Sequence, residues 1–208
     1  MLDHVLKTSK SKTLGYIGHS LGNLMMFGLL SKHPEYSQII KPFIALSPVF
    51  YLNELKTPLR YIRYIESILR RFPSSFFHAD QLRTAISTFC SNRYLLKMCH
   101  YPFHYFLGIG PQNIDMNRLG VFMDNVPTGS GSVLASHLGQ IINNRPTHFN
   151  YGDDKINFDH YKSEDIPFYD ESLINSTDIA LVYAKDDWFN SEVNIELLKE
   201  NLKGKYQI

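Results

Sequence analysis

The sequence predicts a mixed α/β fold in which parallel strands alternate with helices. Residues 14–30 follow a pattern of strand, sharp turn and helix, and residues 42–46 form a second short apolar strand. Two parallel strands joined by a helix make a βαβ unit. A third strand is expected at residues 179–183, followed by an amphipathic helix at 191–202. With 208 residues and a 44% hydrophobic content, the chain can form one sizeable core.

Charge and hydropathy exclude several classes of protein. The formal net charge is +1, which gives no indication of a nucleic-acid partner. The sequence has no long run of apolar residues, so no transmembrane helix is expected. Residues 1–7 contain no apolar core of a signal peptide and instead favour a short helix leading into the first strand.

The segment Gly18-His19-Ser20-Leu21-Gly22 is a G-x-S-x-G motif between the first strand and its helix. In α/β-hydrolases this turn is the nucleophile elbow, and here it makes Ser20 the candidate nucleophile, strained and exposed. Gly18 and Gly22 would let the chain turn tightly and the helix pack closely. The backbone N–H of Leu21 would stabilise the developing oxyanion. The motif also occurs by chance, but the flanking strand and helix favour the catalytic interpretation.

The acid of such a site is expected after a later strand, because the chain order in this fold is Ser, then Asp or Glu, then His. Asp187 follows the third predicted strand, and Asp186 beside it is an alternative; either could be an ordinary solvated carboxylate. No histidine follows Asp187, the last being His160. Without an imidazole base the Ser20 hydroxyl is a poor nucleophile. A loop for the second oxyanion N–H is also missing, so the predicted site is incomplete.

Residues 51–125 differ in character from the flanking sequence, because they show helical spacing and no β alternation. We interpret this segment as a helical insertion over the sheet, hence a cap. Its apolar residues could form a lid over a lipid site, although composition alone favours ordinary helix packing. The segment contains one predicted amphipathic helix, with its apolar face formed by Tyr61, Ile62, Ile65, Ile68 and Leu69. Two groups of aromatic residues follow: Phe72, Phe76 and Phe77, and then Tyr101, Phe103, Tyr105 and Phe106.

Cys90 and Cys99 both lie within this insertion. A disulfide between them would contribute about 2–3 kcal/mol in the chain-entropy model, and the alternative is two buried thiols. No metal site is expected, because neither a C-x-x-C nor an H-E-x-x-H pattern is present. Further along, residues 132–144 predict a helix with Ser132 as N-cap, 147–175 read as irregular, and 206–208 resemble the start of a strand.

Taken together, these features resemble the animal acid lipase family, which includes gastric and lysosomal acid lipases. The elbow resembles the family's Gly-His-Ser-Gln-Gly, with Leu21 in place of Gln; the backbone N–H is kept and any contact of the Gln side chain is lost. Residues 43–49 match the family's Tyr-Ala-Leu-Ala-Pro-Val strand end. The resemblance spans nearly the whole chain, and its other matching residues are Pro127, Gly129, Ser130, His137, Gln140, Phe149, Asn150, Tyr151, Gly152, Asn157, Tyr161, Pro167 and Tyr169.

The resemblance implies a partial α/β-hydrolase fold with a mostly parallel sheet and a helical cap. Residues 1–50 would form the start of the core with the elbow, 51–125 the cap or lid, and 126–208 the return to the core with the acid loop. The resemblance places the acid at Asp187, and it makes the cysteine pair a cap disulfide. The family's histidine segment would fall after Ile208, so the 208 residues are expected to be a fragment that lacks both ends.

The family hydrolyses triacylglycerols or cholesteryl esters at a lipid–water interface, and the resemblance implies an acyl-enzyme at Ser20 with no cofactor. Asn175-Ser176-Thr177 is a glycosylation acceptor pattern. With the cysteines, it implies that the full-length protein is secreted or lysosomal. Because no histidine follows the acid, this chain alone is expected to be inactive. The alternatives are a non-catalytic lipid-binding protein that lost its histidine, and a serine hydrolase of other substrates, such as a thioesterase or peptidase.

Overall fold

The centre of the computed structural model is a three-stranded parallel sheet in the order β1-β2-β5. Its strands are β1 (Leu14–His19), β2 (Ile40–Leu46) and β5 (Ile179–Val182). The strands predicted at residues 14–18, 42–46 and 179–183 are therefore confirmed, and the two pairings are both parallel. The structure describes residues 1–76, 84, 88–90, 92, 94–108, 110, 112, 115, 118–123, 130–142, 144–175, 178–203 and 206.

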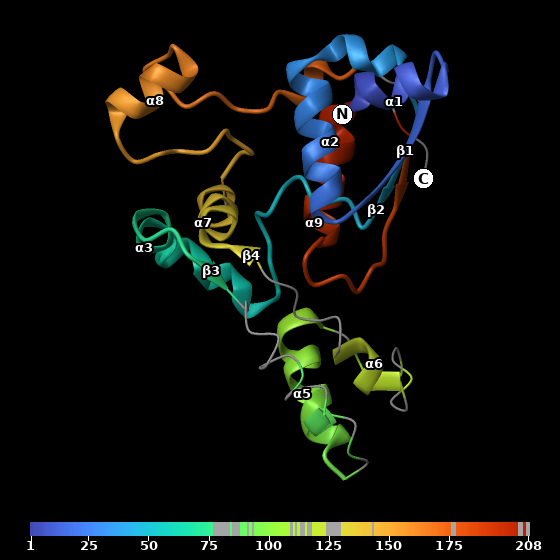
Figure 1. Ribbon diagram of the computed structural model, residues 1–208, viewed down its shortest axis with the longest axis vertical. Helices are drawn as coiled ribbons and strands as arrows, with labels where there is room; N and C mark the ends of the chain where they lie inside the picture. Colours follow the sequence, from blue (N-terminus) through green and yellow to red (C-terminus); the bar gives the residue numbers. More distant parts are fainter. Residues whose placement is uncertain are drawn as a thin grey trace.

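Helices connect and cover these strands. The predicted N-terminal helix is α1 (Leu2–Ser9), which leads into β1, and α2 (Leu21–Lys32) joins β1 to β2 as the helix of the βαβ unit (Figure 1). The helix stops before Pro34, because a proline disfavours helix in the preceding residue, and a 3₁₀ turn, η1 (Pro34–Gln38), follows. After β5, the predicted terminal helix is α9 (Glu192–Leu202), capped by Ser191.

The core lies between one face of the sheet and the helices α2 and α9. Phe43 of β2 is in register with Tyr16 of β1 and Ile179 of β5, so these three side chains share that face. Phe27 of α2 is fully buried against it, with 5.0 Å between the Phe27 and Phe43 ring centroids. Leu198 of α9 belongs to the same buried cluster. This shared core fixes the orientation of α2 and therefore of the turn before it.

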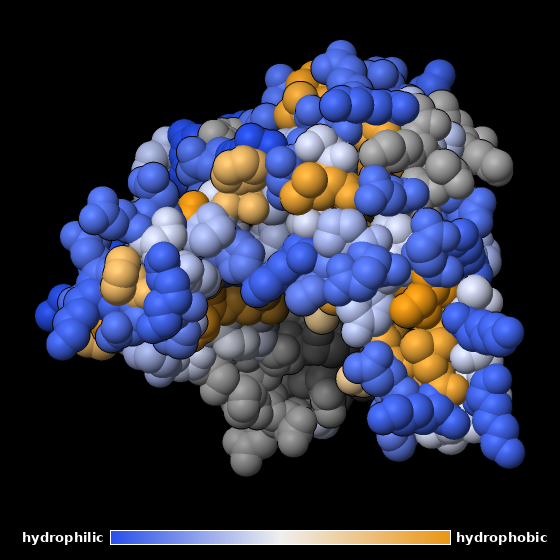
Figure 2. Space-filling view, turned by 90° about the horizontal axis from the view of Figure 1, so that it is seen from above, coloured by the Kyte–Doolittle hydropathy of each residue, from blue (hydrophilic) through white to orange (hydrophobic). Residues whose placement is uncertain are grey.

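The opposite face of the sheet is less well covered. Ile17 of β1 is 67% exposed and Val182 of β5 is 52% exposed. Both lie on edge strands of the sheet. Apolar residues also reach the surface in separate patches on the face of the molecule seen in Figure 2. Within the described residues, the hydrophobic core therefore lies mainly on the α2 side of the sheet.

A buried polar cluster fastens α9 to the core. The hydroxyl of Tyr51 donates a hydrogen bond to the carboxylate of Glu171, which lies in a 3₁₀ turn, η5 (Glu171–Leu173). Asn201 of α9 donates to the Tyr51 hydroxyl oxygen at 3.0 Å, and the Arg145 guanidinium lies 3.8 Å from the Glu171 carboxylate. Burial, followed by the bond to Glu171, raises the pKa of Tyr51, so its phenol stays protonated and continues to donate.

The chain makes an excursion from the core between two short paired strands. β3 (Ser75–Phe76) pairs antiparallel with β4 (Ser130–Gly131), so the segment between them leaves and returns at one place. Two helices of that segment, α5 (Leu96–Leu107) and α6 (Leu119–Met123), lie together below the sheet in Figure 1. A disulfide joins Cys90 to Cys99 of α5, which confirms the predicted pair.

The helix expected at residues 61–69 is instead two short elements, a 3₁₀ helix η2 (Pro58–Tyr64) and α3 (Glu66–Arg71). Both pack on α7 (Ser132–Ile141). The approach is close enough that a Cβ at Gly139 would lie 2.7 Å from the Glu66 Cβ and 3.2 Å from the Ile62 carbonyl oxygen. The predicted helix is therefore broken where η2 and α3 pack closely on α7.

Two further expectations differ from the structure. Ser132 is the first residue of α7 rather than its N-cap, because its hydroxyl accepts the Ser74 N–H at 2.8 Å instead. The stretch 147–175 contains α8 (Asp154–Tyr161), which begins where Asp153 accepts the Ile156 N–H at 2.9 Å. Several residues that the sequence analysis names lie outside the described part of the structure: Phe77, Pro127, Gly129, Ser176, Thr177, Gln207 and Ile208.

Replacing Phe27 by Ala should destabilise the fold by about 3–5 kcal/mol, because it leaves a cavity at the centre of the core. Met25→Ala on the same helix is the matched control: Met25 is 70% exposed, so its truncation should change stability by less than about 0.5 kcal/mol. Urea unfolding monitored by circular dichroism measures both. Equal losses would show that α2 does not pack as described.

Candidate active site

Ser20 has the backbone conformation of a strained elbow. It stands between the last residue of β1 and the first residue of α2, with φ 52° and ψ −117°. A non-glycine residue with positive φ costs of order 1–3 kcal/mol and persists only where its surroundings hold it. The Ser20 N–H donates to the Leu46 carbonyl oxygen of β2 at 3.0 Å. The expected strain at Ser20 is therefore present.

A buried amide supports this turn. Asn23 is fully buried, and its side-chain nitrogen donates to the same Leu46 carbonyl oxygen at 2.8 Å. A Cβ at Gly18 would overlap the Asn23 side chain and lie 2.9 Å from the Tyr16 ring. The absence of a side chain at Gly18 is therefore what allows Asn23 to reach β2.

Gly22 is less constrained than the sequence suggests. A Cβ there would lie 3.5 Å from the Tyr16 hydroxyl oxygen, which is an ordinary contact. The Gly22 carbonyl oxygen accepts a hydrogen bond from the Tyr16 hydroxyl at 2.9 Å, and the backbone of any residue at position 22 could accept it. The expectation that Gly22 is needed for close packing is wrong for this structure, and Gly18 alone carries that role.

Leu21 is the first residue of α2. Backbone N–H groups in a first helical turn have no acceptor within their own helix and sit at the positive end of the helix dipole. The geometry next to Ser20 thus suits a donor to an oxyanion, the role expected for the Leu21 N–H.

A cavity of about 510 Å³ opens at Ser20. It lies where the carboxyl ends of the parallel strands meet, the edge at which α/β sheets bind ligands. Ser20 follows β1, Ser47 follows β2, and Asp186 and Asp187 come from the loop after β5, and all four line the cavity. The structure therefore brings the candidate nucleophile and both candidate acids into one space.

The two aspartates differ in how firmly they are held. One carboxylate oxygen of Asp187 accepts the backbone N–H groups of Phe189 at 2.8 Å and Asn190 at 3.0 Å. Asp186 is exposed, and no such bond holds it within the described part of the chain. A fixed carboxylate is what orienting an imidazole requires, so the geometry favours Asp187 over Asp186.

Trp188 is a lining residue that the sequence did not single out. It contacts α5, because the His104 and Trp188 ring centroids are 5.7 Å apart. Gly108 ends α5 with φ 71°, and a Cβ there would lie 2.7 Å from the indole Cδ1. The excursion thus reaches the Ser20 cavity at Gly108, which packs on Trp188 of the loop after β5. The position of the chain's single Trp beside the candidate acid was the only available signal.

The histidines with described surroundings do not supply a clear base. His19, the neighbour of Ser20 in the chain, lines the cavity. His160 of α8 stacks on Tyr151 at 4.3 Å and lines a different cavity together with Lys32. Lys32 ends α2, about 16 Å from its first residue at 1.5 Å per residue. His160 therefore lies toward the other end of α2 from Ser20. No cluster of metal-binding side chains occurs among the residues whose structure is described.

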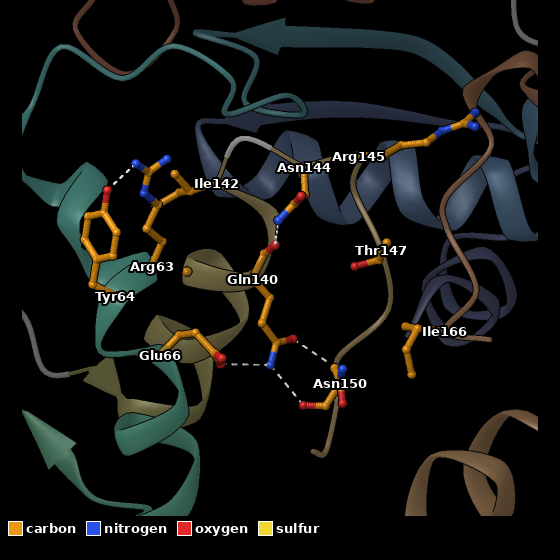
Figure 3. Close-up of a pocket in the computed structure, with 11 residues that line it drawn as sticks. Arg63, Tyr64, Glu66, Gln140, Ile142, Asn144, Arg145, Thr147, Asn150 and Ile166 are labelled. Atoms are coloured by element: carbon orange, nitrogen blue, oxygen red, sulfur yellow. Dashed lines mark hydrogen bonds between the residues drawn. The ribbon is translucent and has the colours of Figure 1, made fainter. Parts of the chain in front are cut away.

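A cavity of about 730 Å³ between α7 and the η2–α3 pair has a different character. Figure 3 shows its wall, where the Gln140 amide donates to Glu66 at 3.2 Å and to the Asn150 carbonyl at 2.9 Å. The same amide accepts the Asn150 N–H at 2.9 Å. This network ties α7 to its neighbours, and the cavity shares no lining residue with the one at Ser20.

A strained serine between a parallel strand and a helix, with an acid after a later strand of the same sheet, is the arrangement used by α/β-hydrolases. The described helices contain none that is long and apolar enough to cross a membrane.

Sequence similarity to known proteins agrees with the α/β-hydrolase arrangement. No protein-family model matches the chain. Human lipase member J is 27% identical over 97% of this chain and 56% of its own length. Rat gastric triacylglycerol lipase is 29% identical over 82% of the chain, and human lipase member K 26% identical over 81%. The chain is thus related to the acid lipases, the family that its motifs resemble, and it spans about half the length of the curated relatives it matches.

Gly18→Ala should destabilise the protein by about 1–3 kcal/mol, because the new Cβ overlaps Asn23 and forces the elbow to shift. The matched variant Gly22→Ala should be neutral or stabilising by up to about 1 kcal/mol, since Ala is favoured over Gly in a helix. Urea unfolding gives both values. Full stability of Gly18→Ala would contradict the close contact between Gly18 and Asn23.

Proposed function

We propose that Ser20 is the nucleophile of a lipase that hydrolyses carboxylic esters of triacylglycerols or cholesteryl esters. The observation that carries this proposal is the strained backbone of Ser20 at a cavity shared with Asp187. The lipase names of the related proteins support it. The reaction needs no cofactor, because a serine and its base complete it.

In the proposed reaction, the Ser20 oxygen attacks the ester carbonyl carbon while a base takes its proton. The carbonyl oxygen becomes an oxyanion, which the Leu21 N–H stabilises. Collapse of this intermediate breaks the ester C–O bond, and the returned proton leaves with the alcohol. Water then attacks the acyl-serine by the same steps and releases a carboxylic acid.

The base in this proposal is a histidine of the full-length protein that follows the acid in the chain. Asp187 would hold its imidazole in the correct tautomer and orientation. The carboxylate is suited to this because two backbone N–H groups fix one of its oxygens.

The proposed cap is residues 51–125, with core segments at 1–50 and 126–208. Its α5 carries large apolar side chains at helical spacing that are 45–71% exposed: Met98, Tyr101, Tyr105 and Phe106. An exposed apolar face of this kind suits contact with a lipid–water interface. Because Gly108 at the end of α5 packs on Trp188, a lipid bound on this face would lie close to the Ser20 cavity.

One observation favours a second candidate, a lipid-binding protein without catalysis. Among the described residues that line the Ser20 cavity, the only imidazole is that of His19, the neighbour of the nucleophile. If the full-length protein also lacks a histidine that reaches Ser20, the apolar face of α5 would still bind lipid while the serine stays protonated.

Activity of the full-length protein separates these candidates. Ser20→Ala should reduce ester hydrolysis by about six orders of magnitude, and Asp187→Asn by about four. Asp186→Asn is the matched control and should stay close to wild type, because only one carboxylate can orient the imidazole. Hydrolysis of emulsified triacylglycerol and cholesteryl ester, with thioester and peptide substrates alongside, measures this.

Equal losses at the two aspartates would refute the assignment of the acid. Preference for thioesters or peptides would instead indicate another serine hydrolase. Expressed as residues 1–208, the chain should neither turn over esters nor react readily with a fluorophosphonate at Ser20. Ser20-dependent turnover by these residues alone would mean that a histidine within them acts as the base.

Asn175 should carry an N-glycan if the protein is secreted or lysosomal. Asn175 is exposed, and its backbone N–H donates to the Ser37 hydroxyl at 3.3 Å, just before β5. Asn175→Gln should abolish the mass shift caused by glycosidase treatment of secreted protein. Asn144→Gln, an exposed asparagine outside any acceptor pattern, should leave the shift unchanged. Secreted protein without a glycan at Asn175 would count against this location.

A further inference from the structure

An apolar groove of about 640 Å³ runs between α2 and α7. Leu21, Met25 and Leu29 of α2 line one side, and they form one stripe because residues four apart share a helix face. Leu134 and Ile141 of α7 line the other side. The groove shares no lining residue with the cavity at Ser20, although it starts at the neighbouring residue.

Each wall of this groove has one apolar side chain that is exposed to solvent. Met25 is 70% exposed and Leu134 is 40% exposed. Between the helices, the ring of Tyr169 packs on Gly28, where a Cβ would lie 3.2 Å from the ring. Exposed apolar side chains on both walls of a groove mark a candidate binding surface.

One end of the groove is basic. Lys32, the last residue of α2, lies there with His137 and His148, and no described lining residue is acidic. Burial, together with the charges of Lys32 and His137, lowers the pKa of His148. The lowered pKa keeps His148 neutral, so Lys32 supplies the positive charge that an anion would meet at this end of the groove.

Length and charge together define the ligand. From Leu21 to Lys32 the α2 stripe is about 16 Å long at 1.5 Å per residue. We propose that this groove binds a long-chain fatty-acid anion, with the tail between α2 and α7 and the carboxylate at Lys32. A neutral lipid would leave the basic end without a partner. The site is separate from the proposed chemistry, although a fatty acid is what ester hydrolysis releases.

Displacement of a fluorescent polyene fatty acid from the whole chain tests this proposal, in a Ser20→Ala background so that catalysis plays no part. Oleate should displace the probe at lower concentration than oleyl alcohol, which has the same chain without the charge. Lys32→Gln should weaken oleate binding about fivefold, the size expected for a partly exposed charge pair, and leave the alcohol unaffected. Lys7→Gln on α1 is the matched control and should have no effect.

A second pair of variants tests the walls. Met25→Glu should weaken both ligands by about tenfold, because it places a charge beside the tail. Val193→Glu, at a 52% exposed position of α9, should not. Binding that is unchanged by both Lys32→Gln and Met25→Glu, or equally weakened by their controls, would overturn the proposal. Ester hydrolysis by the protein with Ser20 intact is measured separately, so failure of the groove and failure of the proposed activity are distinguishable.

Discussion

The backbone carbonyl of Leu46, at the end of β2, accepts hydrogen bonds from both the Ser20 N–H and the Asn23 side chain. These two bonds tie the end of β1 and the start of α2 to the neighbouring strand. They hold Ser20 in a backbone conformation that a non-glycine residue would otherwise leave. Because β2 also pairs with β5, the same strand sets the distance between Ser20 and the loop that carries Asp187.

The strands and the elbow were predictable because their signals are local. Apolar runs marked β1, β2 and β5, and a motif with its flanking elements marked Ser20. The break within residues 61–69 was not predictable, because it accompanies the approach of Gly139 from a distant helix. The bond between Tyr51 and Glu171 joins residues 120 positions apart, which no local pattern reveals.

The candidate site also contains features that the sequence predicts and features that only the folded structure shows. Asp187 could be named from its position after a strand, but its advantage over Asp186 depends on two backbone N–H groups that only the folded loop presents. Trp188 and Gly108 meet because α5 ends against that loop. The basic end of the groove between α2 and α7 likewise combines residues from three separate segments, each unremarkable alone.

Within the described residues, the strand that carries Ser20 lies at an edge of the sheet, and Ile17 within it is 67% exposed. An edge strand offers unpaired backbone groups to any other strand that approaches, and an apolar side chain strengthens such pairing. If residues 1–208 are expressed alone, their self-association would therefore begin at this strand, beside the elbow. Light scattering as a function of protein concentration would reveal this self-association. Because it would take place beside the elbow, aggregation would also make Ser20 less accessible.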